Sequence, residues 1–257
     1  MDVLSRSDNP VWKPENLTSI LPGLATHLLE MLPLQQHQRV LDIATGTGTC
    51  ALASARRGLS VTATDIKMSQ VSVCRSQAAQ QKLRIDVQVA DCRRLPFAEA
   101  TFDLITGTGA LSNMDEPLQC LREAVRVLKP AGYGLGDFLL PEIAHEVWGL
   151  LSVFKYGSRR PYVDYAQLQD LLDAADLDVI GYRPLRWVYP LSKSIDPLNA
   201  PSEVKQLYFQ MISETSSAVR RALRLHEKNG GWTVIYDCFA LVARWRCASP
   251  WHWRYEG

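Results

Sequence analysis

Two glycines, Gly46 and Gly48, stand where a short apolar run gives way to an alanine-rich segment. Glycine lets the backbone adopt positive φ and approach a ligand closely. The exposed N–H groups of a following helix would favour an anionic group such as a carboxylate or a phosphate. The glycines alone therefore indicate a loop that binds a small ligand, without identifying it.

Acidic side chains accompany this loop and restrict what it could bind. Asp42 precedes the glycines, and Asp65 and Asp91 end the next two apolar runs. A carboxylate before the glycines suits an ammonium group, and Asp65 is placed to accept hydrogen bonds from two ribose hydroxyls. Asp91, together with the backbone N–H of Cys92, can pair with the edge of an adenine. These positions indicate a ligand that contains an amino acid, a ribose and an adenine.

The same glycines also satisfy the dinucleotide pattern G-x-G-x-x-A over residues 46–51, with Asp65 further along the chain. A nicotinamide-dependent oxidoreductase is therefore the competing hypothesis. Asp42 argues against it, because a carboxylate on the strand before the glycines would not suit a pyrophosphate.

Between residues 39 and 140, apolar runs typical of strands alternate with helical patterns. Strands are predicted at 39–43, 60–64, 85–90, 101–106 and 133–140, and helices at 49–57, 68–82 and 118–128. This alternation predicts a parallel sheet with helices on both faces, in which ligands bind beyond the carboxyl ends of the strands. The residues that follow strand ends are Gly46, Asp65, Asp91 and Gly107. We therefore expect all four at one edge of the sheet.

The pattern is less regular outside this core. Helices are predicted at 17–32, 167–175 and 202–226, and extended segments at 178–187 and 234–245. We expect a single domain over residues 1–257, with a cofactor-binding core at 38–140. The segments 141–165 and 188–230 are interpreted as caps that contact the substrate.

Successive segments of the core resemble the motifs of class I S-adenosylmethionine-dependent methyltransferases. They are Val40-Leu41-Asp42-Ile43-Ala44-Thr45-Gly46-Thr47-Gly48, Asp65, Asp91-Cys92-Arg93-Arg94-Leu95-Pro96-Phe97, Phe102-Asp103-Leu104-Ile105-Thr106 and the stretch 121–132. The subgroup that this chain resembles most is related to the ubiquinone/menaquinone-biosynthesis (UbiE-like) C-methyltransferases. The resemblance implies a Rossmann-like α/β fold: a seven-stranded sheet flanked by helices, with the last strand antiparallel and with helical cap insertions.

The resemblance also implies S-adenosyl-L-methionine as the cofactor and a role for individual residues. The implied cofactor-binding residues are Asp42, Ala44, Gly46, Gly48, Asp65, Ile66, Met68, Asp91, Cys92 and Gly107. The two glycines would pack against the methionine and the ribose, and Asp42 would engage the ammonium group directly or through water. Ile66 or Met68 would pack on the purine, and Gly107 would border the methionine.

Two positions depart from the family pattern, and the catalytic group is not evident. Ala44 replaces the usual first glycine, and Ser112-Asn113 stands where many relatives carry two histidines. His145 is the candidate general base, with a surface histidine as the alternative. Trp148, Trp187 and Tyr208 are either an aromatic substrate pocket or part of the hydrophobic core.

Composition and charge exclude several classes of function. The chain has 257 residues with 28 basic and 27 acidic side chains, a net charge of +1. Such a balance predicts no binding to nucleic acid or to an anionic membrane. The six cysteines are scattered without metal-ligand spacing, so we expect free thiols and no metal. With no signal peptide or apolar run of about 20 residues, a soluble cytoplasmic protein is predicted.

The leading hypothesis is a methyltransferase that moves a methyl group to oxygen, carbon or nitrogen of a small organic acceptor, in secondary metabolism. A second hypothesis keeps the cofactor without the transfer, as a cyclase or a regulatory module. The nicotinamide-dependent oxidoreductase is the third. The aromatic and basic tail, residues 250–255, is interpreted as a docking tail or as a contact in a homodimer.

Overall fold

The computed structural model describes residues 19–20, 24–111, 114–134, 165–192, 202–222, 225–228 and 231–246. The chain divides into two compact units. We call the first the core unit; it comprises residues 22–139, 160–182 and 240–257. The second unit comprises residues 1–21, 140–159 and 183–239.

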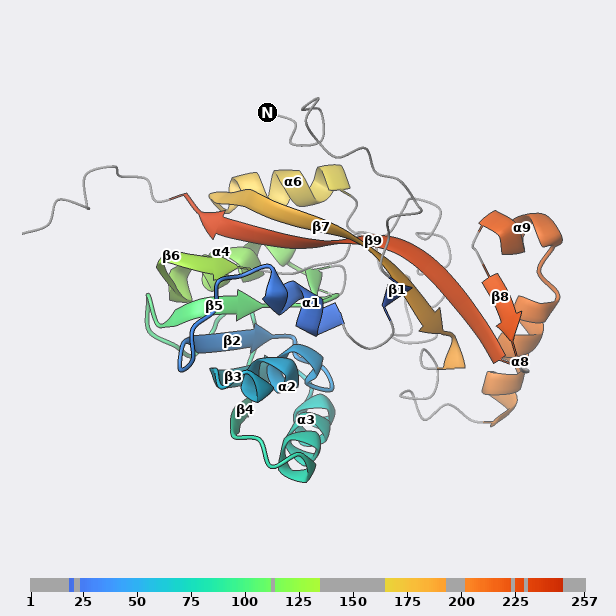
Figure 1. The fold of residues 1–257 in the computed structure, drawn as a ribbon, viewed down its shortest axis with the longest axis horizontal. Coiled ribbons are helices and arrows are strands. Elements are labelled where there is room, and N and C mark those ends of the chain that lie inside the picture. The colour runs from blue at the N-terminus through green and yellow to red at the C-terminus, as the bar shows by residue number, and fades with distance from the viewer. Residues whose placement is uncertain are drawn as a thin grey trace, which may run out of the picture. The chain divides into compact units, whose positions relative to one another are not determined.

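The core unit is built on a parallel sheet. Its parallel strands are β2 (Arg39–Ile43), β3 (Ser60–Asp65), β4 (Ile85–Val89), β5 (Phe102–Thr106) and β6 (Leu128–Gly134). They lie in the order β6-β5-β2-β3-β4 (Figure 1). This order places the carboxyl ends of β2, β3, β4 and β5 along one edge, as the sequence predicts.

Two long strands belong partly to each unit. They are β7 (Leu177–Pro190) and β9 (Gly231–Trp245). In the core unit β9 pairs with β6 in the antiparallel sense, with Tyr133 opposite Arg244. Its residues Ala240–Ala243 are all buried, as expected for a strand covered on both faces.

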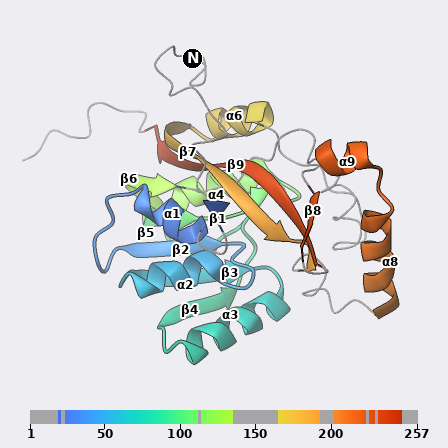
Figure 2. The same ribbon diagram turned by 45° about the vertical axis from the view of Figure 1, so that its right-hand side comes forward.

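Helices cover the core sheet. They are α1 (Leu24–Glu30), α2 (Thr49–Arg56), α3 (Met68–Gln80), α4 (Pro117–Val127) and α6 (Tyr165–Ala174). Figure 2 shows α2 and α3 beside β3 and β4, while α4 packs against α6. A buried cluster that includes Leu41, Phe102 and Val127 joins the sheet to α4. No helix among the described residues is both long and apolar enough to cross a bilayer.

The second unit contains shorter elements. They are β1 (Ser19–Ile20), α8 (Ser202–Ser213), α9 (Ser217–Ala222) and β8 (Leu225–Lys228), together with the remaining parts of β7 and β9. β1 pairs with β7 in parallel, and β8 pairs with β9 in the antiparallel sense.

The predicted fold class is confirmed, whereas the strand count is wrong. The described strands form a path of eight with β8 paired to β9, rather than seven. Part of the predicted 202–226 helix is β8, whose Lys228 pairs with Gly231. The sequence between them is Asn-Gly, the dipeptide that favours hairpins, and this signal should have outweighed helical periodicity.

Two other boundaries differ from the predictions. The segment 17–32 is not one helix, because Ser19–Ile20 pairs with β7 as a strand and α1 begins at Leu24. The strand predicted at 133–140 begins earlier, at Leu128, where its backbone pairs with Phe102. In both cases pairing with a distant strand overrides the local pattern.

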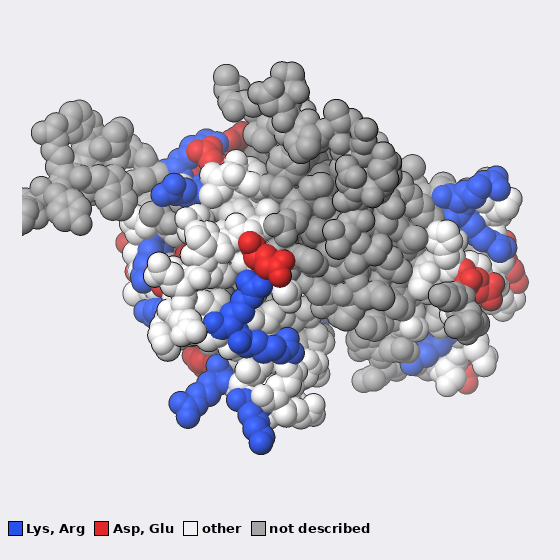
Figure 3. Space-filling model, in the orientation of Figure 1, with Lys and Arg blue, Asp and Glu red and all other residues white. Residues whose placement is uncertain are grey.

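Charges of both signs are spread over the described residues. On the face in Figure 3, basic and acidic side chains lie interspersed. Both signs occur on the left and on the right of that face, in keeping with the net charge of +1.

Candidate functional site

The loop between β2 and α2 has an unusual backbone. Ala44, Gly46 and Gly48 have φ values of 49°, 56° and 92°. A Cβ on Gly46 would meet no atom within 4 Å, whereas a Cβ on Gly48 would lie 2.6 Å from the Sγ of Cys74. Gly48 therefore permits close packing against α3, and Gly46 leaves the opposite side of the loop open. Ala44 adopts the left-handed conformation despite its side chain, at a cost of about 1–2 kcal/mol.

Asp42 lies beneath this loop and connects it to its surroundings. Its side chain is 2% exposed, and its Oδ1 accepts a hydrogen bond from Oγ1 of Thr106 at 2.5 Å. Its Oδ2 accepts hydrogen bonds from Oγ1 of Thr45 at 2.5 Å and from the backbone N–H of Ala51 at 3.2 Å. One carboxylate therefore joins β2, β5, the loop and the first turn of α2.

Burial also changes the acidity of Asp42. Desolvation raises the pKa of this carboxyl from 3.8 to about 6, and the hydrogen bonds from Thr106, Thr45 and Ala51 oppose the rise. At neutral pH the group is therefore mostly charged. A negative charge at the first turn of α2 also interacts favourably with the helix dipole.

Asp65, at the end of β3, holds the loop from the other side. Its Oδ2 accepts a hydrogen bond from the backbone N–H of Gly46, and its Oδ1 accepts one from that of Lys67, both at 2.9 Å. Each carboxylate oxygen can accept more than one hydrogen bond, so both remain able to accept a ligand hydroxyl. The next residues toward α3, Ile66 and Met68, are each 60% exposed, which suits the apolar contact predicted for them.

The segment after β4 is held by its own ion pairs. Arg93 donates to Asp91 from Nε at 3.0 Å and from Nη2 at 2.6 Å. Its Nη1 donates to Glu116 at 2.9 Å. The hydrogen bonds from Arg93 lower the pKa of Asp91, so this carboxyl stays charged at neutral pH. Asp91 is thus fixed at the predicted adenine end of the site.

One polar face of α4 fixes the rest of this segment. Gln119 donates to the carbonyl of Arg93 at 3.2 Å, and Glu123 accepts from the N–H of Leu95 at 2.8 Å. Arg126 donates to the carbonyls of Leu95 and Phe97 at 3.0 and 2.8 Å. These side chains recur every three or four residues along the helix and therefore share one face.

Among the predicted cofactor residues, the structure joins two directly and shows how a third packs. Gly46 and Asp65 are directly hydrogen-bonded, and a Cβ on Gly107 would lie 3.1 Å from Cγ1 of Ile43, so Gly107 packs tightly on β2. The sequence reasoning missed Thr45 and Thr106. The signal in the sequence was a hydroxyl residue just after β2, Thr45, and another at the last position of β5, Thr106.

Several acceptor-side predictions lie outside the described residues. They are His145, Trp148 and Ser112-Asn113. The backbone of Trp187 belongs to β7, and Tyr208 is buried in α8. The role of His145 as a general base stays a prediction.

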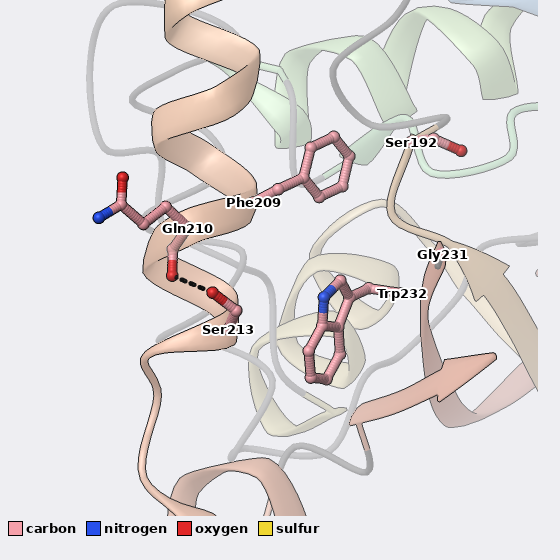
Figure 4. Close-up of a pocket in the computed structure, with 6 residues that line it drawn as sticks. All are labelled: Ser192, Phe209, Gln210, Ser213, Gly231 and Trp232. Carbon is pink, nitrogen blue, oxygen red and sulfur yellow. Dashed lines mark hydrogen bonds between the residues drawn. The ribbon is translucent and has the colours of Figure 1, made fainter. Parts of the chain in front are cut away.

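The second unit contains a cavity of about 530 Å³. It is lined by Ser192, Phe209, Gln210, Ser213, Gly231 and Trp232. Figure 4 shows the rings of Phe209 and Trp232 pointing into the space between α8 and β9, while the Gln210 side chain points away. Ser213 donates to the carbonyl of Gln210 at 2.8 Å, so its hydroxyl is already engaged within α8.

Comparison with known proteins identifies the region that carries the site. A family described as "Methyltransferase domain" matches residues 40–132, from β2 through the first part of β6. This span contains the loop, Asp42, Asp65, the 91–97 segment and α4.

Two curated relatives are named as methyltransferases, and their names give different acceptors. A demethylmenaquinone methyltransferase of Renibacterium salmoninarum is 37% identical over 112 residues, covering 44% of each chain. A 27-O-demethylrifamycin SV methyltransferase of Amycolatopsis mediterranei is 35% identical over 136 residues, covering 50% of each chain. The chain spans about half the length of these relatives.

Solved structures share the fold over a longer stretch. A candidate methyltransferase of Bacillus halodurans has a TM-score of 0.71 at 20% identity and covers 86% of this chain and 97% of its own. The [4+2]-cyclase SpnF has a TM-score of 0.61 at 21% identity and covers 87% of this chain and 81% of its own. At these identities the likeness establishes the fold alone.

The buried carboxyl of Asp42 predicts a pH dependence of stability. Its folded pKa of about 6 exceeds its ordinary value of 3.8, so the folded state binds the extra proton. This stabilisation is complete below pH 3.8 and is lost as pH rises through about 6. We expect wild type to lose about 1 kcal/mol of unfolding free energy between about pH 5 and pH 7, relative to Asp42→Asn.

Urea unfolding at a series of pH values measures this difference. Asp86→Asn is the matched control, because Asp86 is an exposed acid on β4 and should leave the wild-type slope unchanged. Equal slopes for wild type and Asp42→Asn would contradict the assigned titration.

Proposed function

We propose that the protein is an S-adenosylmethionine-dependent methyltransferase that acts on a small organic acceptor. The observation that carries the proposal is the open side of the loop at Gly46, with the carboxylate of Asp65 hydrogen-bonded beside it. A loop with space for a ligand, next to a carboxylate that can accept ribose hydroxyls, fits the methyl donor of this family. The match of residues 40–132 to a methyltransferase domain supports the same conclusion.

The residues present fit the cofactor at each end. Asp65 would accept the ribose hydroxyls, and Ile66 and Met68 would cover the purine with side chains that are now 60% exposed. Asp91 and the N–H of Cys92 would hold the adenine edge. Asp42 has little access to solvent, so we assign it to positioning the loop that receives the methionine end.

The bound cofactor would supply an activated methyl group on a sulfonium, and an acceptor atom would attack that carbon in line while the neutral thioether, S-adenosylhomocysteine, leaves. The protein contributes position, because displacement requires the acceptor to lie behind the methyl group at near-attack distance. The hydrogen-bonded network of Asp42 fixes the loop, and the polar face of α4 fixes the adenine end. The donor would then bind with little rearrangement of either segment.

The acceptor is proposed only as a small organic molecule, bound with help from the cap segments 141–165 and 188–230. The named acceptors of the relatives differ, a menaquinone precursor in one case and a rifamycin precursor in the other. The fold also occurs in a cyclase, so the fold by itself does not prove methyl transfer.

Calorimetric titration with S-adenosylhomocysteine tests the cofactor assignment. We expect saturable binding to one site per chain and none with a nicotinamide dinucleotide. Binding of the dinucleotide alone would support the oxidoreductase instead.

Incubation with methyl-labelled cofactor and a panel of phenol, quinol and amine acceptors then tests methyl transfer. Product formed without consumption of cofactor would indicate the cyclase and contradict transfer.

Gly46→Ala tests whether the open side of the loop receives the cofactor. The added Cβ projects into space that is free of protein atoms, where we place the ligand. We expect the affinity for S-adenosylhomocysteine to fall at least about tenfold, which corresponds to about 1.4 kcal/mol. Calorimetry measures the affinity, and thermal unfolding confirms that the variant is folded.

Gly58→Ala is the matched control for this substitution. Gly58 lies just beyond α2 and also has a positive φ, 79°. Its added Cβ would make only ordinary contact with Gln36. The control should lose stability through the same backbone strain but keep wild-type affinity. An equal loss of affinity in both variants would show that strain, rather than the occupied space, is responsible.

A further inference from the structure

Two cysteines meet where the 91–97 segment lies on α4. The Sγ atoms of Cys92 and Cys120 are 2.6 Å apart, although the residues are 28 positions apart in the sequence. A disulfide places its sulfur atoms about 2.05 Å apart, so bond formation requires only a small movement of either side chain. Both are free cysteines in the structure, so the two thiols are not joined.

The two thiols differ in accessibility and acidity. Cys92 is partly exposed, whereas Cys120 is 1% exposed. The hydrogen bond with Cys120 lowers the pKa of the Cys92 thiol, and the same contact raises that of Cys120. The thiolate is the reactive form of cysteine, so Cys92 is suited to attack a disulfide. Cys120 is placed to resolve the mixed disulfide that this attack forms.

The other described cysteines of the domain lack these properties. Cys50 and Cys74 are both buried, and desolvation raises the pKa of each thiol. The Sγ of Cys50 contacts the hydroxyl of Thr108 at 3.5 Å rather than a second thiol. Accessibility, acidity and a neighbouring thiol therefore coincide at Cys92.

We infer that Cys92 and Cys120 are a redox-active pair, which a low-molecular-weight disulfide such as glutathione disulfide oxidises to an intramolecular disulfide. The Cys92 thiolate attacks one sulfur of the oxidant, forming a mixed disulfide and releasing one thiolate. Cys120, after loss of its proton, attacks the Cys92 sulfur and releases the second thiolate. Two protein thiols are oxidised, and one small disulfide is reduced to two thiols.

The position of the pair connects it to the cofactor, and this connection rests on the proposed function. The backbone of Cys92 follows Asp91 at the proposed adenine end, and α4 holds the same segment through Glu116 and Gln119. A bound adenine would cover Cys92 and restrict its attack on the oxidant. Cofactor occupancy and the rate of oxidation of Cys92 are therefore coupled.

Oxidation of the full chain in graded glutathione buffers tests the pair. Alkylation of the remaining thiols and mass analysis of the intact protein should show the loss of two hydrogen atoms, and peptide mapping should join Cys92 to Cys120. Cys120→Ser should instead accumulate a glutathione adduct at Cys92, because the resolving thiol is missing. Cys92→Ser should leave Cys120 unmodified, because Cys120 is buried.

Cys74→Ser is the control, and it should form the same disulfide as wild type. The inference is overturned if mapping joins Cys92 or Cys120 to another cysteine, or if Cys120→Ser gives no adduct at Cys92. None of these measurements requires the cofactor, so they stand or fall independently of the proposed function.

Saturation with S-adenosylhomocysteine tests the coupling separately. In protein that calorimetry shows to bind the ligand, we expect oxidation of Cys92 to slow several-fold. Binding without any change in the oxidation rate would contradict the coupling and leave the dithiol intact. Failure to bind would contradict the proposed function, a result that the calorimetry reveals before oxidation is measured.

Discussion

The carboxylate of Asp42 joins the elements on which the site depends. It accepts hydrogen bonds from Thr45 in the loop, Thr106 at the end of β5 and Ala51 in α2. A buried charge is costly unless hydrogen bonds compensate for lost water, and here three donors do so. Removing any one donor would leave this charge less compensated. The shape of the loop and the start of α2 therefore depend on this buried group, while Asp65 holds Gly46.

A second constraint comes from α4, whose two faces have different tasks. Its apolar side, with Leu121, Ala124 and Val127, is buried in the core. Its polar side holds the backbone of the 91–97 segment, where an adenine would lie. Since both faces belong to one rigid helix, packing of the core and placement of the segment are coupled. Cys120, which is buried with the apolar side, contacts Cys92 of the same segment.

The region that matches a methyltransferase domain accounts for the proposed donor site better than for the proposed acceptor site. Its relatives carry names with different acceptors, and its fold also serves a cyclase. Chemistry in such folds is determined by particular side chains rather than by the sheet. The proposed donor site is formed by strand ends that the sheet must bring together. The acceptor site is proposed to involve the cap segments, which lie after the matched residues 40–132.

The sequence by itself determined the alternation of strands and helices from 39 to 134, because buried parallel strands are continuous apolar runs ending in Gly or Asp. It also predicted Gly46, Gly48, Asp65 and Asp91 as cofactor-binding residues, since positions at or just after strand ends are local features. It did not determine β1, β8 or the start of β6, where pairing with distant strands decides the structure. Only the tertiary structure showed that Thr106, 64 positions further along the chain, donates a hydrogen bond to Asp42. It alone also showed that Cys92 contacts Cys120. These contacts depend on how strands and helices pack, which no local pattern encodes.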